Sequence, residues 1–222
     1  MQFIPTPFPN TGVKIFITLC MIFWLGSAIL LSLTDNHTIF QWINTRHTPF
    51  QDMLMPRVTR LGEIILIAAA GIILSSLPRV RQTKYFFLTF IFCNAIPALV
   101  NVIMKNIYAR HRPLHYFQHE SWLHFLDSQP QQYHLSFPSG HTEGVFALMT
   151  LVCLILPRKR AWLSVILFAA ALLTAYSRIY LVQHFFSDIL AGSMVGTIFC
   201  LLTYSAIQNI VLRRREKLDK LN

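Results

Sequence analysis

Acidic residues are scarce in this chain of 222 residues, which has nine Asp and Glu against 19 Lys and Arg. With so few carboxylates, no cluster of acidic ligands for a metal ion stands out, and we expect neither a metal site nor a cofactor. Charged residues of both signs make up 13% of the chain, whereas soluble domains usually have about 25%. Hydrophobic residues make up 54% and form long runs, so the composition favours a membrane protein.

Cysteine is also rare, and the chain has neither internal repeats nor low-complexity tracts. The four cysteines all lie inside apolar runs, and no pair has the spacing of metal ligands. We interpret them as small hydrophobic residues within membrane spans. They are Cys20, Cys93, Cys153 and Cys200.

The net charge of +10 raises the question of nucleic-acid binding. However, the basic residues form short clusters between apolar runs, as in segments that flank membrane spans. No basic recognition helix or nucleic-acid motif is present. The expected partners are therefore the phospholipid bilayer and a lipid, not a nucleic acid.

The apolar runs predict an all-α protein, a bundle of six transmembrane helices forming a single domain over residues 1–222. A helix needs about 20 residues to cross the hydrocarbon, and two of the runs are short and are expected to extend into polar flanks. A single cation, Lys14, precedes the first run, which favours a retained span over a cleaved signal peptide. The predicted spans are 13–33, 61–78, 85–106, 142–157, 161–180 and 189–212.

Clusters of cations predict the orientation in the cytoplasmic membrane. With six spans, these clusters fall on the same side as both termini, and the positive-inside rule makes that side cytoplasmic. Residues 34–60, 107–141 and 181–188 then face the periplasm or cell exterior. The cytoplasmic clusters are Arg79, Arg81 and Lys84, then Arg158, Lys159 and Arg160, then Arg213, Arg214, Arg215 and Lys217.

Three polar blocks interrupt the apolar chain, at residues 105–113, 138–141 and 177–188. All three belong to the predicted outer face, so we expect them to form one site. In the first block, Lys105 and Arg112 share a helix face if the helix continues to Pro113, where they could neutralise a phosphate. Interfacial snorkelling of Lys105 and Arg110 is the simpler alternative for this block alone.

The second block places a helix start beside a glycine. Ser139 is expected to cap the next helix, and Gly140 lets its backbone approach an anion at that helix N-terminus. His141 follows in the first turn, where it is a candidate general acid.

The third block pairs a histidine with a carboxylate. Ser177 and Arg178 end the fifth span, and His184 and Asp188, four apart, are expected on one face of the sixth helix. The carboxylate would orient the ring and leave the other nitrogen nucleophilic. A pair that merely satisfies itself is the structural alternative.

Together the blocks resemble the type 2 phosphatidic acid phosphatase superfamily, the lipid phosphate phosphatases. Its pattern is Lys-x6-Arg-Pro, Pro-Ser-Gly-His and Ser-Arg-x5-His-x3-Asp. Every fixed position of the pattern is present here, in Lys105, Arg112, Pro113, Pro138, Ser139, Gly140, His141, Ser177, Arg178, His184 and Asp188.

The resemblance implies a division of roles. The residue matching His184 attacks phosphorus and becomes a phosphohistidine, the match to Asp188 orients it, and the match to His141 protonates the leaving group. The expected phosphate-binding residues are Lys105, Arg112, Ser139, Gly140 and Arg178. Members of the family need no metal.

The resemblance therefore implies hydrolysis of a lipid phosphate monoester or diphosphate. The candidates are a lipid A phosphate, undecaprenyl diphosphate, phosphatidylglycerol phosphate and phosphatidic acid. Transfer of the phosphoryl group to another lipid is an alternative, as is a non-enzymatic lipid-binding or transport protein on the same fold. Glu63, Glu143 and the outer loops 38–60 and 114–137 are left without an assigned role.

Overall fold

The computed structural model describes residues 10–77 and 86–219, and every regular element in these ranges is helical. The expected all-α class is therefore confirmed. The predicted cations Arg79, Arg81 and Lys84 lie outside the described residues. The helices are α1 (Thr11–Leu33), α2 (Asn36–Asn44), α3 (Pro49–Val58), η1 (Thr59–Gly62), α4 (Ile64–Ser76), α6 (Phe86–Tyr108), α7 (Pro113–Phe117), α8 (Gly140–Ile155), η2 (Arg158–Arg160), α9 (Leu163–Tyr180) and α10 (Phe186–Asp219).

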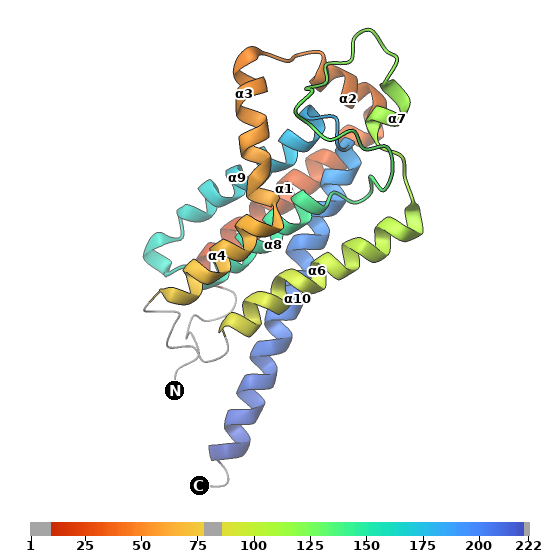
Figure 1. Ribbon diagram of the computed structural model, residues 1–222. Helices are drawn as coiled ribbons and strands as arrows, with labels where there is room; N and C mark the ends of the chain where they lie inside the picture. Colours follow the sequence, from red (N-terminus) through yellow and green to blue (C-terminus); the bar gives the residue numbers. More distant parts are fainter. Residues whose placement is uncertain (1–9, 78–85, 220–222) are drawn as a thin grey trace.

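Helix α8 lies at the centre of the bundle, in contact with α1, α6, α9 and α10 (Figure 1). It has 16 residues, most of them buried. The rings of Phe16, Phe146 and Phe168 meet edge to face where α1, α8 and α9 come together. Because its neighbours enclose it, α8 is largely shielded from the surroundings of the protein.

The outer helices carry large apolar side chains on their exposed surfaces. Examples are Ile22 and Leu25 on α1, Ile65 on α4, Ile103 on α6 and Leu202 on α10, all more than half exposed or nearly so. Apolar surface of this extent, wrapped around a core that contains buried polar residues, fits hydrocarbon rather than water. The chain is a multi-pass membrane protein.

Four helical segments of the described chain are long and apolar enough to cross a membrane: Thr11–Leu33, Phe86–Phe117, Leu163–Tyr180 and Phe186–Arg214. The segment Pro49–Gly62 with Ile64–Ser76 adds a fifth if this pair, bent by 58°, counts as one span. Helix α8 is shorter, since its 16 residues extend about 24 Å at 1.5 Å per residue.

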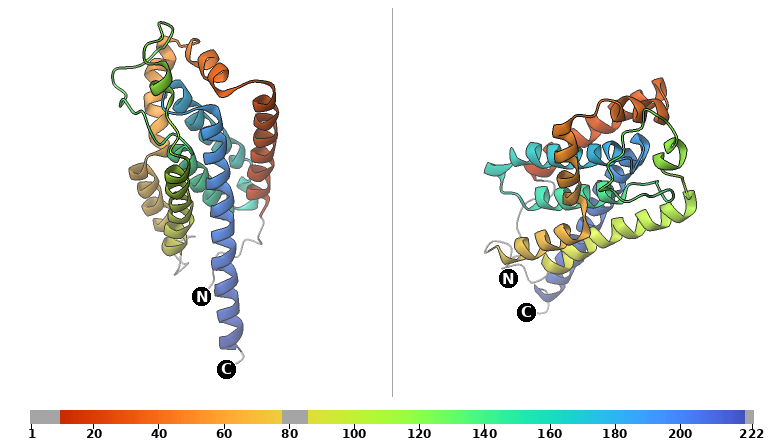
Figure 2. Two further views of the ribbon diagram at one scale, coloured as in Figure 1. Left: turned by 90° about the vertical axis from the view of Figure 1, so that its right-hand side faces the viewer. Right: turned by 45° about the horizontal axis from the view of Figure 1, so that its top comes forward.

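The two ends of the bundle differ in character. Helices α2, α3 and α7 and the long connections around them gather at one end (Figure 1). The connection between α8 and α9, with η2, lies toward the other end, and α10 extends beyond the remaining helices there (Figure 2). The C-terminal part of α10, which carries Arg213 and Arg214, thus lies at the end away from α2 and α3.

Two glycines bring the backbones of α8 and α10 into close contact. A Cβ on Gly192 would lie 2.6 Å from the carbonyl oxygen of Ser139, and a Cβ on Gly196 would collide with the carbonyl oxygen of Glu143. Glycines four residues apart lie on one face of a helix, and small residues there let two helices approach closely. This contact holds the N-terminal turn of α8 against α10.

Replacement of Gly196 by alanine should therefore destabilise the protein. The added Cβ meets backbone that cannot move aside without separating the helices, and overpacking of this kind costs about 1–3 kcal/mol. A lower midpoint of thermal unfolding in detergent is the expected result. Gly26→Ala is the matched control, because no atom lies within 4 Å of a Cβ at Gly26 in α1. Equal midpoints for the two variants would contradict the close contact.

Candidate active site

The first polar block does not continue as one helix. Helix α6 ends at Tyr108, and Ala109 has a φ of 42°, in the left-handed region. Pro113 begins α7 instead of ending α6, so the condition under which Lys105 and Arg112 would share a helix face is not met. Proline suits the first helical position because no N–H is needed there. Lys105 and Arg112 therefore lie on two elements joined by a turn.

The three cations expected to bind phosphate all donate to uncharged oxygens. Lys105 donates to the carbonyl of Leu135 at 2.7 Å, and the Nε of Arg112 to the carbonyl of His134 at 2.9 Å. Arg178 donates to the hydroxyl of Thr59 at 2.7 Å. The Nη1 of Arg112 also lies 3.2 Å from the side-chain oxygen of Gln183. These hydrogen bonds hold the cations without neutralising them.

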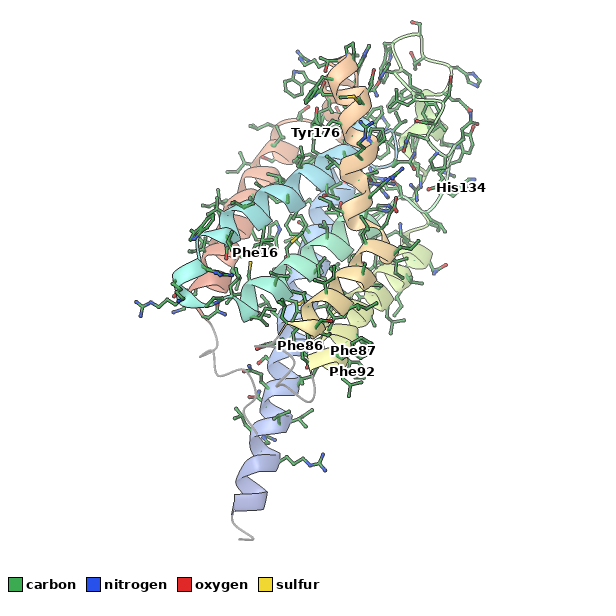
Figure 3. All side chains as sticks on the ribbon, turned by 60° about the vertical axis from the view of Figure 1, so that its left-hand side comes forward. Phe16, Phe86, Phe87, Phe92, His134 and Tyr176 are labelled. Atoms are coloured by element: carbon green, nitrogen blue, oxygen red, sulfur yellow. The ribbon has the colours of Figure 1, made fainter. Side chains whose placement is uncertain are left out.

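The connection from α7 to α8, residues 118–139, supplies several of these acceptors, and we call it the outer loop. His134 lies in it at the end of the molecule where α2, α3 and α7 gather (Figure 3). Leu135 has a φ of 56°, and Ser136 beside it is fully buried. The outer loop thus forms one wall of the site.

The second block folds as expected. The hydroxyl of Ser139 accepts hydrogen bonds from the backbone N–H and the hydroxyl of Thr142, at 3.5 and 3.0 Å, and caps α8. Its own backbone N–H donates to the carbonyl of Asp188 at 3.0 Å. A Cβ on Gly140 would meet only the side-chain oxygen of Asn101, at 3.8 Å. The N-terminus of α8 is therefore open on the side of Gly140, with His141 in its first turn.

The third block differs from the prediction in one respect. Helix α10 begins at Phe186, so His184 precedes it and does not share its face with Asp188. Val182, two residues earlier, has a φ of 61°, which is unusual for a β-branched residue. This turn brings the ring of His184 back toward the helix start. His184 and Asp188 are both buried, with 2% and 0% of their surface exposed.

Asp188 has closer partners than His184. Its carboxylate accepts hydrogen bonds from Ser136 Oγ at 2.5 Å, from the backbone N–H of Phe185 at 2.8 Å and from Arg110 Nη1 at 3.1 Å. The Nδ1 of His184 lies 3.6 Å from the same carboxylate and 3.5 Å from Ser136 Oγ. Asp188 and Ser136 together therefore face the Nδ1 edge of the ring, which leaves Nε2 on the opposite edge.

Burial, and after it the positive charges of Arg112 and Arg178, hold the pKa of His184 well below its ordinary value. Both effects disfavour the imidazolium form. A neutral imidazole whose Nδ1 edge faces a carboxylate has a lone pair available at Nε2. The ring is thus in the protonation state that a nucleophile requires.

Three residues of this arrangement were missed in the sequence. Arg110 was read as a snorkelling side chain, but it pairs with Asp188 and its guanidinium lies 4.9 Å from the ring centre of Phe185. Ser136 and Gln183 gave no signal, because neither belongs to a spaced pattern of charged residues. Their roles depend on the path of the outer loop, which sequence periodicity does not predict.

A cavity of about 720 Å³ adjoins His141. It lies between α4, α6 and the first turns of α8, and most of its lining is apolar. Glu63 and Glu143 both line it, and one carboxylate oxygen of Glu143 is buried without a hydrogen-bond partner among the described residues. Its lining includes Ile64, Ile65, Ile67, Ala68, Phe90, Ile91, Ala95, Ala98, Gly140 and Gly144.

Comparison with known proteins gives a consistent set of relatives. The chain is 26% identical to an undecaprenyl-diphosphatase of Sulfolobus acidocaldarius over 163 residues, and the aligned region covers 73% of each chain. It is 28% identical over 160 residues to a lipid A 4'-phosphatase of Bacteroides thetaiotaomicron, 70% of this chain and 69% of that one. Two further matches are shorter, since the chain spans 45% of a lipid A 1-phosphatase of Rhizobium johnstonii and 24% of a Drosophila melanogaster protein named 'Putative phosphatidate phosphatase'.

The fold also has a solved counterpart. The crystal structure of a transmembrane PAP2 type phosphatidylglycerolphosphate phosphatase from Bacillus subtilis superposes with a TM-score of 0.64 at 22% identity, covering 87% of this chain and 96% of that one. This likeness concerns the fold. The PAP2 superfamily matches residues 86–212, which include all three polar blocks, their cations and the His184–Asp188 turn. The chain therefore belongs to the PAP2 superfamily.

Proposed function

We propose that the protein is a lipid phosphatase that hydrolyses a phosphate monoester or diphosphate of a membrane lipid. The observation that carries the proposal is the site itself. Lys105, Arg112 and Arg178 are held by neutral oxygens around a neutral histidine, so their charge is available to an anion. The relatives described above include an undecaprenyl-diphosphatase and a lipid A 4'-phosphatase, and their activities support the same class of substrate.

In this proposal Nε2 of His184 attacks phosphorus, an N–P bond forms, and the bond from phosphorus to the lipid oxygen breaks. Burial and the neighbouring cations lower the pKa of His141, and a bound phosphate offsets that positive charge so that the ring can carry a proton. His141 gives this proton to the lipid oxygen. Water then attacks phosphorus and passes a proton back to His141, the N–P bond breaks, and inorganic phosphate leaves. The three cations, Ser139 and the amide of Gly140 stabilise the charge that spreads over the phosphoryl oxygens in each step.

The cavity beside His141 suits the hydrocarbon part of such a substrate. Its walls are mostly apolar, and it ends at the open N-terminus of α8. A lipid chain lying between α4 and α6 would place its phosphate near Gly140 and the cations. Lipid A phosphates, undecaprenyl diphosphate, phosphatidylglycerol phosphate and phosphatidic acid share this combination of phosphate and chain.

The proposal places the protein in the cytoplasmic membrane with six spans, both termini in the cytoplasm and the site facing outward. The connection from α8 to α9, which contains the three cations of η2, and the C-terminal end of α10 both lie toward the end away from α2, α3 and α7 (Figure 1). This placement supports the orientation, in keeping with the positive-inside rule. The burial of α8 within the bundle supports the span count, because an enclosed helix can be shorter than a lipid-facing one.

Purified protein in detergent should release phosphate from a lipid phosphate with a metal chelator present. His184→Ala should lower the rate by at least about a thousandfold, because no other group supplies the nucleophile. His119→Ala is the control, since His119 is an exposed histidine of the outer loop. A panel of the four candidate lipids compared by kcat/KM identifies the preferred substrate. Equal rates for His184→Ala and the unaltered protein would refute the proposed chemistry.

Ser136→Ala tests the contact that the sequence did not reveal. Loss of a hydrogen bond to a charged group costs about 1.5–3 kcal/mol, so kcat should fall by about tenfold or more if Ser136 steadies Asp188 beneath His184. The serine control is Ser128→Ala, at an exposed position of the same loop. If kcat is unchanged in Ser136→Ala while its thermal stability falls, Ser136 is structural only.

The low pKa of His184 predicts how activity depends on pH. The ring stays neutral below its ordinary pKa of about 6.5, so protonation of His184 should inhibit kcat/KM only at more acidic pH. Arg112→Gln removes a positive charge that lowers this pKa, and the acid limb should move to higher pH. Titration of the substrate affects both proteins equally, so the comparison isolates the enzyme. Coincident acid limbs would show that His184 does not titrate as described.

A further inference from the structure

A second cluster of polar side chains lies at the same end of the molecule, outside the phosphate-binding residues. It consists of His47, Asp52 and His124, each of which offers one donor atom, and these atoms lie within 4.8 Å of one another. His47 belongs to the turn between α2 and α3, Asp52 to the first turn of α3, and His124 to the outer loop. The start of α3 and the outer loop, which are distant in sequence, therefore meet at one point.

The neighbours of this cluster fix two of its members. The side chain of Asn44 makes two hydrogen bonds, both of 2.8 Å, to the backbone N–H and carbonyl of His124. The hydroxyl of Tyr180 donates to Asp52 Oδ1 at 2.5 Å, and His124 Nε2 lies 2.8 Å from the same oxygen. Outer partners of this kind are typical of metal sites, where they orient the ligands.

The side chain of His47 is the movable member. It is exposed, and its ring stacks on that of His124 with centroids 3.7 Å apart and planes within 6°. Parallel stacked rings cannot both direct a lone pair at one ion, so His47 must turn out of the stack to bind. An exposed side chain makes this rotation at little cost.

Helix α3, which carries Asp52, is held beside α9 by a separate contact. The hydroxyl of Tyr176, labelled in Figure 3, lies 3.4 Å from the side chain of Gln51 of α3.

The donor set indicates the ion. Two imidazole nitrogens and one carboxylate oxygen are ligands of zinc, which binds them at about 2.0–2.2 Å in tetrahedral geometry. Such bonds place donor atoms about 3.4 Å apart, so the cluster must contract by roughly an ångström at its widest. Calcium and magnesium prefer oxygen ligands alone, which makes them poor candidates here.

We propose that His47, Asp52 and His124 bind Zn²⁺, with water as the fourth ligand, and that the ion fastens the outer loop to α3. The same loop supplies Ser136 to Asp188 and backbone carbonyls to Lys105 and Arg112. The zinc ligands themselves do not overlap with the residues proposed to hold or attack phosphate. The ion thus has a structural role, linking the outer loop to α3, and its removal should lower the thermal stability of the protein without ending turnover.

Titration of chelator-stripped, full-length protein in detergent with ZnCl₂ tests the proposal. Isothermal titration calorimetry should give one site per chain, and saturating zinc should raise the midpoint of thermal unfolding by about 5 °C or more. In His47→Ala the affinity should fall by about tenfold or more. Substitution with Co²⁺ should give the visible absorption of a tetrahedral site in the unaltered protein and not in His47→Ala.

Two further variants serve as controls. His119→Ala removes another histidine of the outer loop, and His115→Ala disturbs the separate group in which the Nδ1 atoms of His111 and His134 lie 3.0 Å apart. Both should keep the zinc response. Absence of a zinc-dependent shift, or a shift that survives in His47→Ala and disappears in His115→Ala, would overturn the proposal. Phosphate release is independent of these outcomes, so failure here leaves the proposed function standing.

Discussion

One buried carboxylate joins the parts of the site. The side chain of Asp188 accepts hydrogen bonds from Arg110 of the first block, from Ser136 of the outer loop and from the backbone of Phe185. Its main-chain carbonyl accepts the N–H of Ser139 at the start of α8. An isolated charge at this depth would be very costly, and these partners are what allow it to be buried. The turn of His184 and the outer loop take their positions from the same residue.

The cations present the opposite problem, because like charges repel at close range. Arg110 pairs directly with Asp188, whereas Lys105, Arg112 and Arg178 donate to uncharged oxygens and make no direct ion pair among the described residues. Carboxylates act on these three cations only from a distance. A phosphate group brings two or more negative charges and several acceptor oxygens, and it would relieve the repulsion that the fold otherwise sustains. The electrostatics of the site thus select for the charge of its ligand.

The sequence was sufficient for the helical class and for the approximate limits of the six long apolar helices, and it predicted that the three blocks lie together. It gave no bounds for α2, α3 and α7. Long apolar runs and the cap at Ser139 are local signals, which is why they could be read without a structure. The turns were not readable in this way. Ala109, Leu135 and Val182 all have positive φ without being glycine, so residue type gives no local signal for these turns. The placement of His184 ahead of α10, the pairing of Arg110 with Asp188 and the contribution of Ser136 all follow from these turns.

The glycines of α10 divide the site into two walls with different freedom to vary. Gly192 and Gly196 press α10 against α8, and this wall carries Ser139 and Asp188. The other wall, from α4 and α6, contributes apolar side chains such as Ile65 and Ile91 to the cavity. Substitutions in the second wall would change the shape of the cavity and leave the backbone contact of the first intact. Under the proposed function, the preference for one lipid over another could therefore change through α4 and α6 without moving Ser139 or Asp188.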